Sequence, residues 1–313
     1  MLRKARLSYF VTEPGQRLAL YGSGCLTVGL FAANFLPHTI GIGYYKEFIQ
    51  AFRDGKQREL SEKLRYRFER AVKLLNLSTF EKKFVSPFVV IGFDVFNAGY
   101  MKSRFGGIVG IPINFEYGSA ADIEKSEVVL CDQKINWSSE GGKLLEESLV
   151  LSEDEQVFGI AREILILNTH KKLIQSIIPA ASWMFVYGTA ATMNARGNFY
   201  ARPLSLRLVL YAICSAFGYG IYSFATDMCE IHYDSDVDKQ LAVLGPDVID
   251  AGARFYDKIL KKNVALRKLT GENYYTAKGN INYMIRQKTA PLTMRKEFFV
   301  SGYKEFIAKE ESS

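Results

Sequence analysis

The sequence predicts an α+β membrane protein that is mainly helical, with three transmembrane helices and a domain that carries a small sheet. Three stretches contain no Asp, Glu, Lys or Arg: residues 18–45, 173–195 and 208–226. A helix needs about 20 such residues to cross the hydrocarbon core of a bilayer. Between the first and second stretches lie apolar runs rich in Val, Ile and Phe, which are typical of strands.

The uncharged stretches organise the whole chain. A basic segment, 1–17, precedes a first transmembrane helix at 18–37, which ends at Pro37. Two further spans, 173–193 and 208–226, form a transmembrane hairpin over 173–226. We expect the rest to form one domain in two parts: residues 46–172 as its α+β part and residues 227–313 as its C-terminal helical part.

The net charge of +7 is concentrated at two places. One is the N-terminal segment, and the other is the hairpin loop, which carries Arg196, Arg202 and Arg207 and no acidic residue. With three spans these two places share one side of the membrane. The positive-inside rule puts that side in the cytosol or the mitochondrial matrix and the main domain opposite. No basic stripe with interleaved aromatic residues is present, so nucleic-acid binding is disfavoured.

The first twelve residues carry basic residues and Ser but no acid, which weakly indicates a mitochondrial targeting segment. A secretory signal is the rival interpretation. The apolar run that follows is long and lacks a small-x-small cleavage pattern, which favours a retained anchor. The four cysteines form no Cys-x-x-Cys pair, so no disulfide framework is expected. The three histidines share no metal-ligand spacing.

The α+β part begins with helical periodicity and continues with strand-like runs. Residues 44–77 predict one amphipathic helix or a pair of helices. Residues 88–95 and 108–113 each predict a strand, and Pro112 in the second favours an edge strand or a bulge. Short strands are also expected at 128–130 and 135–137.

The helices of the second half are predicted from caps and periodicity. Ser152 and Glu155 fit a capping box that opens a helix running towards Lys172, with an open question whether it continues into the second span. After the third span, residues 234–244 and 246–260 predict two more helices.

The order of these parts resembles the membrane-embedded zinc metalloproteases of the HtpX and Oma class, and so implies a zincin-like (metalloprotease-like) domain. In that class an edge strand that binds substrate precedes a helix with His-Glu-x-x-His. A membrane hairpin can follow, and a later helix supplies the third ligand. Two histidines four residues apart share a helix face and bind zinc, while the Glu acts as general base.

The resemblance implies that this chain has lost the metal site. The segment 162–166 reads Arg-Glu-Ile-Leu-Ile, so Arg162 and Ile166 take the two His positions and Glu163 keeps that of the base. Asp234 takes the third-ligand position and Asp238 that of a trailing acid. A guanidinium repels zinc, so we expect no metal, no cofactor and no catalysis. Arg162 either pairs with Asp234 or Asp238 where the metal would be, or is a solvated helix residue.

A second resemblance covers more of the chain. Its segments are Gly-Ile-Val-Gly-Ile-Pro at 107–112, Phe-Gly-Ile-Ala-Arg-Glu at 158–163 and Phe-Tyr-Asp-Lys-Ile-Leu at 255–260. These are similar to the transmembrane protein 177 family. That resemblance implies a multi-pass protein of the mitochondrial inner membrane, with cytochrome c oxidase subunit 2 and its assembly chaperone as partners besides membrane lipid. The N-terminus and hairpin loop would then lie in the matrix and the main domain in the intermembrane space.

Two functions follow. The first is a non-enzymatic assembly factor built on a pseudo-metalloprotease scaffold. It would hold a client on an edge strand, by β-augmentation, with residues Ile108, Val109, Gly110, Ile111, Pro112 and Ile113. The second is an active membrane metalloprotease with unusual ligands, which needs His170, His232, Glu163 or Asp234 to converge. A channel or transporter ranks low because the spans carry no charged residue.

Overall fold

The computed structural model describes residues 9–53, 55–125, 128–130 and 133–310, and these divide into two compact units. The membrane unit consists of Met1–Pro37 and Lys172–Cys229. The second unit, here called the domain, consists of His38–Lys171 and Glu230–Ser313.

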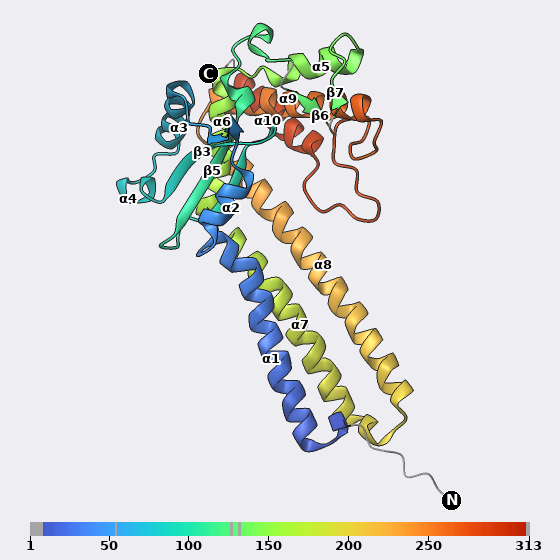
Figure 1. The fold of residues 1–313 in the computed structure, drawn as a ribbon. Coiled ribbons are helices and arrows are strands. Elements are labelled where there is room, and N and C mark those ends of the chain that lie inside the picture. The colour runs from blue at the N-terminus through green and yellow to red at the C-terminus, as the bar shows by residue number, and fades with distance from the viewer. Residues whose placement is uncertain (1–8, 54, 126–127, 131–132, 311–313) are drawn as a thin grey trace, which may run out of the picture. The chain divides into compact units, whose positions relative to one another are not determined.

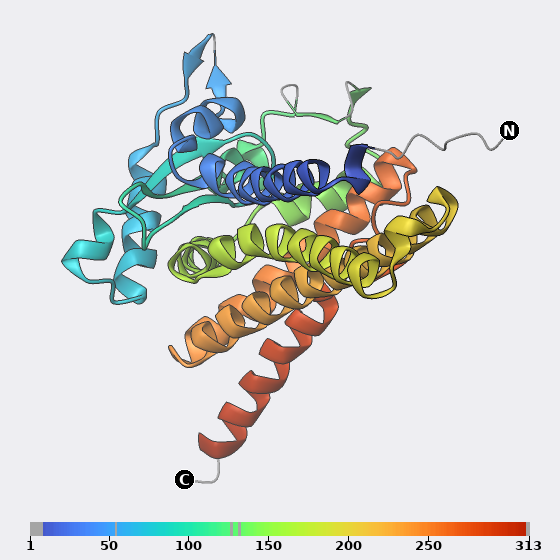
Figure 2. The same ribbon diagram turned by 90° about the horizontal axis from the view of Figure 1, so that it is seen from below.

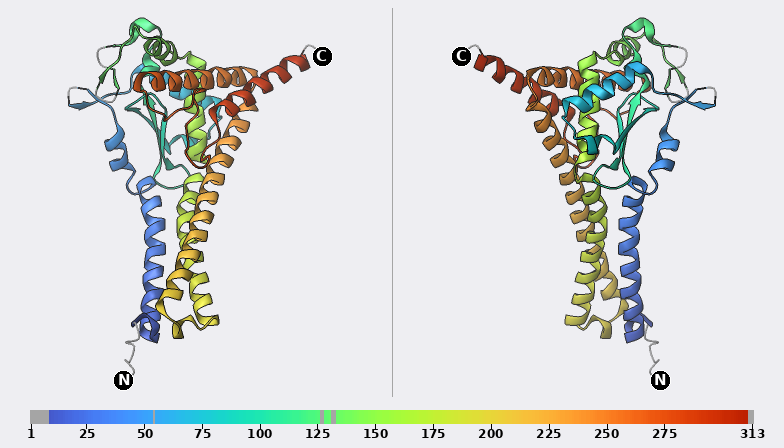
Figure 3. Two further views of the ribbon diagram at one scale, coloured as in Figure 1. Left: turned by 90° about the vertical axis from the view of Figure 1, so that its right-hand side faces the viewer. Right: turned by 90° about the vertical axis from the view of Figure 1, so that its left-hand side faces the viewer.

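Among the residues that the structure describes, three helices of the membrane unit are long and apolar enough to cross a membrane, which agrees with the expected number of spans. They are α1 (Glu13–Phe35), α7 (Lys171–Arg196) and the first part of α8 (Leu204–Ala242). In this unit the helices run side by side (Figures 1 and 3). The short helix η5 (Phe199–Ala201) lies in the turn between α7 and α8, and η1 (Tyr9–Val11) precedes α1.

Polar side chains join the helices of the membrane unit. Trp183 on α7 donates from Nε1 to Ser23 Oγ on α1 at 3.0 Å. Asn194 on α7 donates from Nδ2 to Tyr211 Oη on α8 at 2.9 Å. Such bonds stabilise helix association in lipid, where an unpaired polar group has no water to bind.

Helix α8 is longer than the sequence indicates. A separate helix at 234–244 was expected after the third span, but α8 continues without a break over 39 residues to Ala242. Its part up to Cys229 belongs to the membrane unit, and its part from Glu230 belongs to the domain. No Pro or Gly interrupts the segment from Ile221 to Ala242, so nothing stops the helix at the end of the span. In contrast, α6 (Glu153–Asn168) ends before α7 begins, so the helix that opens at Ser152 does not continue into the second span.

The domain contains a three-stranded sheet of β3 (Val85–Val90), β5 (Gly106–Pro112) and β4 (Phe96–Tyr100), in that spatial order. β5 runs parallel to β3 and antiparallel to β4. The expectation that this segment is an edge strand is therefore wrong: Ile108, Val109, Gly110 and Ile111 lie in the central strand with Pro112 as its last residue. Pro112 is tolerated because its missing N–H falls at the end of the ladder, opposite Val90. Ile113 lies outside the strand, in the short helix η3 (Ile113–Glu116).

The rest of the domain is built from helices and small hairpins. The region 44–77 forms two helices separated by a small hairpin of β1 and β2 (Phe52–Arg53 and Lys56–Gln57). Two short strands are expected at 128–130 and 135–137. The first is present as β6 (Val129–Leu130), but its partner β7 is Gln133–Lys134, and residues 135–137 are not a strand. Residues 126–127 and Cys131 lie outside the described residues. The remaining helices are α2 (Ile42–Ile49), α3 (Glu62–Leu74), α4 (Thr79–Lys82), η2 (Leu36–His38), η4 (Ala120–Asp122), α5 (Glu140–Leu149), α9 (Pro246–Thr270) and α10 (Leu292–Glu310).

Helix α6 is at the centre of the domain core. Its predicted capping box is present: Ser152 Oγ accepts from Glu155 N and Glu155 Oε2 accepts from Ser152 N. Phe158 and Ile164 are fully buried among side chains from the sheet, α3, α9 and α10. Gly159 allows close approach of α9, because a Cβ there would lie 2.7 Å from the Phe255 ring. Helix α10 runs out from the domain towards the C-terminus (Figures 2 and 3).

Candidate functional site

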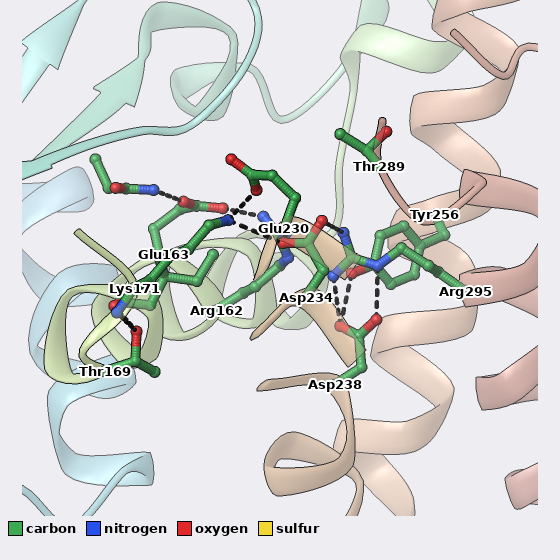
Figure 4. Close-up of polar contacts among 12 residues, drawn as sticks. Arg162, Glu163, Thr169, Lys171, Glu230, Asp234, Asp238, Tyr256, Thr289 and Arg295 are labelled. Atoms are coloured by element: carbon green, nitrogen blue, oxygen red, sulfur yellow. Dashed lines mark hydrogen bonds and ion pairs between the residues drawn. The ribbon is translucent and has the colours of Figure 1, made fainter. Parts of the chain in front are cut away.

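A cluster of largely buried charged side chains lies in the domain, where α6, α8 and α10 meet (Figure 4). Three members are basic and four are acidic. We call this set the charge cluster; its residues are Arg162, Glu163, Lys171, Glu230, Asp234, Asp238 and Arg295. Charged groups this deeply buried are rare unless they are paired.

Three of the four acidic residues of the cluster come from the domain part of α8. Glu230, Asp234 and Asp238 follow one another at intervals of four residues, so they lie on one face of the helix. Like charges at this spacing repel one another. The face is therefore stable only when basic groups from other elements neutralise it.

Arg162 on α6 is the first of these basic groups. Its Nη1 pairs with Glu163 Oε1, and its Nη2 donates to Asp234 Oδ1 at 3.0 Å. Burial works to lower the pKa of the Arg162 guanidinium, but the negative charges of Glu163, Asp234 and Asp238 outweigh it and raise that pKa well above its usual value. Arg162 is therefore charged at every physiological pH. Glu163 is held from its other side by Asn97 Nδ2 on β4.

Asp234 is the meeting point of three cations. Besides Arg162, Lys171 Nζ lies 3.5 Å from Asp234 Oδ1 and Arg295 Nη1 lies 3.5 Å from Asp234 Oδ2. Lys171 is the first residue of α7 and also pairs with Glu230 Oε2. One carboxylate thus joins the side chains of α6, α7 and α10 to α8.

Asp238 is bound by a fork of two hydrogen bonds. Arg295 on α10 donates from Nε to Asp238 Oδ2 at 2.6 Å and from Nη2 to Asp238 Oδ1 at 2.7 Å. Tyr256 on α9 donates its hydroxyl to Asp238 Oδ1 at 2.8 Å, and the Arg295 guanidinium lies 4.8 Å from the centre of the Tyr256 ring. Burial raises the pKa of the Tyr256 phenol, so it remains a neutral donor. Paired forks of this kind are the strongest ion pairs available to side chains.

The residues at the degenerate metal-site positions do not fit zinc. Ile166 is buried in the core and has no ligand atom, and Arg162 contributes a positive charge. Asp234 is already engaged by three cations. Within the described part of the chain, no three His, Cys, Asp or Glu side chains are grouped so that they could hold a metal ion.

The two histidines that an active metalloprotease would need as zinc ligands lie outside the charge cluster. His170 Nδ1 is 2.6 Å from Tyr100 Oη, and its Nε2 is 3.2 Å from Lys102 Nζ. His232 is exposed and packs edge-on against the ring of Tyr233. Among the residues that the structure describes, neither histidine is hydrogen-bonded to Glu163 or Asp234.

The structure brings Arg162, Glu163, Asp234 and Asp238 together, with Ile166 on the same helix as the first two. Sequence reasoning gave no site role to Asn97, Lys171, Glu230, Tyr256 and Arg295. The four-residue spacing of Glu230 with Asp234 was a readable signal for a common helix face. No such signal marks Arg295, which lies 57 residues from Asp238.

Comparisons with known proteins agree on one family. The family model described as Transmembrane protein 177 matches residues 90–295. Among curated proteins, Transmembrane protein 177 of Rattus norvegicus is 29% identical over 301 residues, covering 93% of this chain and 94% of the relative. The protein of that name from Danio rerio is 30% identical over 305 residues (94% and 96%), and that from Homo sapiens 30% over 220 residues (67% and 69%). No solved structure matches.

Proposed function

Because this chain belongs to the transmembrane protein 177 family, we propose that it is a non-enzymatic assembly or stabilisation factor of the mitochondrial inner membrane. Its domain is a pseudo-metalloprotease scaffold that acts through protein contacts. Its partners are cytochrome c oxidase subunit 2 and the dedicated membrane chaperone of that subunit. The N-terminus and hairpin loop lie in the matrix and the domain lies in the intermembrane space.

The observation that carries the absence of catalysis is the ion pair of Arg162 with Glu163 and Asp234. In the metalloprotease order that the sequence resembles, these residues take the places of a zinc ligand, the general base and another ligand. A guanidinium about 4 Å from Zn²⁺ is repelled by roughly 8 kcal/mol at an effective dielectric constant of 20, since zinc carries two charges. The same carboxylates instead stabilise the junction of α6 with α8.

We assign the proposed client surface to a strand other than β5, the strand that the sequence indicated. β5 is paired on both sides, so an added strand cannot reach it without displacing β3 or β4. The outer strands of this sheet are β3 and β4. The end of β3 is already bridged by Gln50, which pairs with Val90. On β4 the backbone N–H of Gly99 donates to His38 Nδ1 at 3.3 Å. We assign β4 to an extended client segment, which would have to displace this contact.

The catalytic question is tested by metal analysis and a peptidase assay on the purified full-length protein. We expect zinc far below one atom per chain and no proteolysis that depends on Glu163. The matched variant is Glu163→Gln, which keeps the size of the side chain and removes its charge. Stoichiometric zinc, or cleavage that Glu163→Gln abolishes, would overturn the proposal in favour of a metalloprotease with unusual ligands.

The partners and the sidedness are tested together by proximity labelling in intact mitochondria, with the labelling enzyme fused after Ser313. We expect labelled cytochrome c oxidase subunit 2 and other proteins of the intermembrane space. Labelling of matrix proteins alone would contradict the proposed orientation. An unchanged level of newly made subunit 2 in cells that lack the protein would contradict the proposed role.

A further inference from the structure

Arg207 lies in the first turn of α8, at the end of the membrane unit where the hairpin turns. This residue is only 7% exposed, and its Nε is buried with no hydrogen-bond partner among the described residues. A guanidinium has five N–H donors and remains charged at any physiological pH. Burying it without a counter-charge is strongly unfavourable, so this position requires an anion.

The membrane unit contains no carboxylate for Arg207. Residues 173–226 have no Asp or Glu, and the only acidic residues in the sequence of this unit are Glu13 and Asp227. Glu13 is exposed and pairs with Arg17 at 2.6 Å. Asp227 is twenty residues further along α8, which is about 30 Å along a helix axis. The counter-charge therefore does not come from this unit.

The surroundings of Arg207 add to the positive charge. The N-terminus of a helix carries about half a positive charge, which disfavours a cation in the first turn. Arg196 and Arg202, at either end of the connection from α7, are both exposed. This end of the hairpin is thus suited to a bound anion.

A second buried polar group lies close to Arg207. Tyr211 follows Arg207 by one turn on the same face of α8, and its hydroxyl accepts the hydrogen bond from Asn194. Asn194 is 2% exposed, and its Oδ1 is also buried without a described partner. The site therefore offers an unpaired N–H donor at Arg207 Nε and an unpaired acceptor at Asn194 Oδ1. A phosphodiester accepts from the guanidinium, and a headgroup hydroxyl can donate to the amide oxygen.

We propose that the hairpin turn of the membrane unit binds the phosphate of an anionic phospholipid, with Arg207 as its principal ligand. The end of a membrane-spanning helix lies at the depth of the lipid headgroups, so a lipid phosphate is the anion available there. This site is separate from the charge cluster, and it does not depend on the identity of the client.

The test uses the full-length chain in phosphatidylcholine nanodiscs with and without phosphatidylglycerol. The measurements are the thermal unfolding midpoint and the phosphatidylglycerol retained in native mass spectrometry. We expect phosphatidylglycerol to raise the midpoint of the wild-type chain. We expect Arg207→Gln to bind it about tenfold more weakly, as for the loss of one hydrogen-bonded charge. Arg17→Gln is the matched control, because it removes the same charge from an exposed pair on α1 and is expected to bind as the wild type does.

Three results would overturn the proposal. The first is a wild-type chain that does not distinguish phosphatidylglycerol from phosphatidylcholine, a test that needs no variant to fold. The second is Arg207→Gln with unchanged lipid retention. The third is inorganic phosphate that stabilises the wild-type chain as much as phosphatidylglycerol does, which would assign the site to a free anion. If Arg207→Gln does not fold, Arg207→Lys replaces it, with weakened retention expected and unchanged retention counting against the proposal.

Discussion

Arg162 Nη2 on α6 lies 3.0 Å from Asp234 Oδ1 on α8, although 72 residues separate them in the sequence. Between them the chain passes through both helices of the membrane hairpin. The pair therefore joins the two ends of the hairpin within the domain. A second ion pair, between Lys171 at the start of α7 and Glu230 on α8, joins the same two ends.

Replacing Arg162 with Met is expected to destabilise the domain strongly. The change leaves Glu163 and Asp234 buried without their shared cation, and breaking a buried pair from one side costs about 3–5 kcal/mol. Arg70→Met is the matched control, because Arg70 is 40% exposed and pairs with Glu153 and Asp154 at the surface. There the expected loss is about 0–1 kcal/mol. Thermal or denaturant unfolding in detergent measures both, and equal losses would show that the charge cluster contributes no more than a surface pair.

Tyr256→Phe is expected to change how stability depends on alkaline pH. Burial raises the pKa of Tyr256 above its ordinary value of 10.0, so the folded state holds the phenolic proton more tightly than the unfolded state. The stabilisation is fully present below pH 10 and is lost as the pH rises beyond it. Unfolding of both proteins between pH 8 and about 11 tests this. The wild type should lose stability more steeply than Tyr256→Phe, and parallel curves would contradict the assignment.

The resemblance to zinc metalloproteases makes a gain-of-binding prediction. Substituting both Arg162→His and Ile166→His rebuilds His-Glu-x-x-His on α6, with both imidazoles on one helix face. We expect this double variant to bind about one zinc per chain by elemental analysis, with Asp234 as an additional ligand. Arg162→His alone is the control, since a single histidine does not complete the pair. A double variant with no more zinc than the control would mean that α6 and α8 do not have the metalloprotease arrangement.

The central position of β5 predicts slow amide hydrogen exchange. Its backbone groups pair with β3 on one side and β4 on the other, and all seven of its residues are buried. Amides of Ile108 and Val109 should therefore exchange more slowly than those of the exposed hairpin β1–β2. Exchange at similar rates would indicate that the sheet opens at β5, which is what insertion of a client strand at that position requires.

The sequence alone was sufficient for features that depend on neighbouring residues. A membrane span is a matter of length and absent charge, so residues 18–37, 173–193 and 208–226 could be identified as spans without a partner. The capping box of Ser152 and Glu155 is equally local, because its two hydrogen bonds are made within one turn.

The tertiary structure decided which elements meet. Pro112 indicated an edge strand, but at the last position of β5 its missing N–H disturbs no ladder, and the strand is central. The side chains that neutralise Asp234 and Asp238 come from α6, α7 and α10, and no local pattern links those helices to α8. Pairing of buried charges depends on distances of a few ångströms between segments far apart in the chain, and such distances are set by packing, which periodicity and composition do not encode.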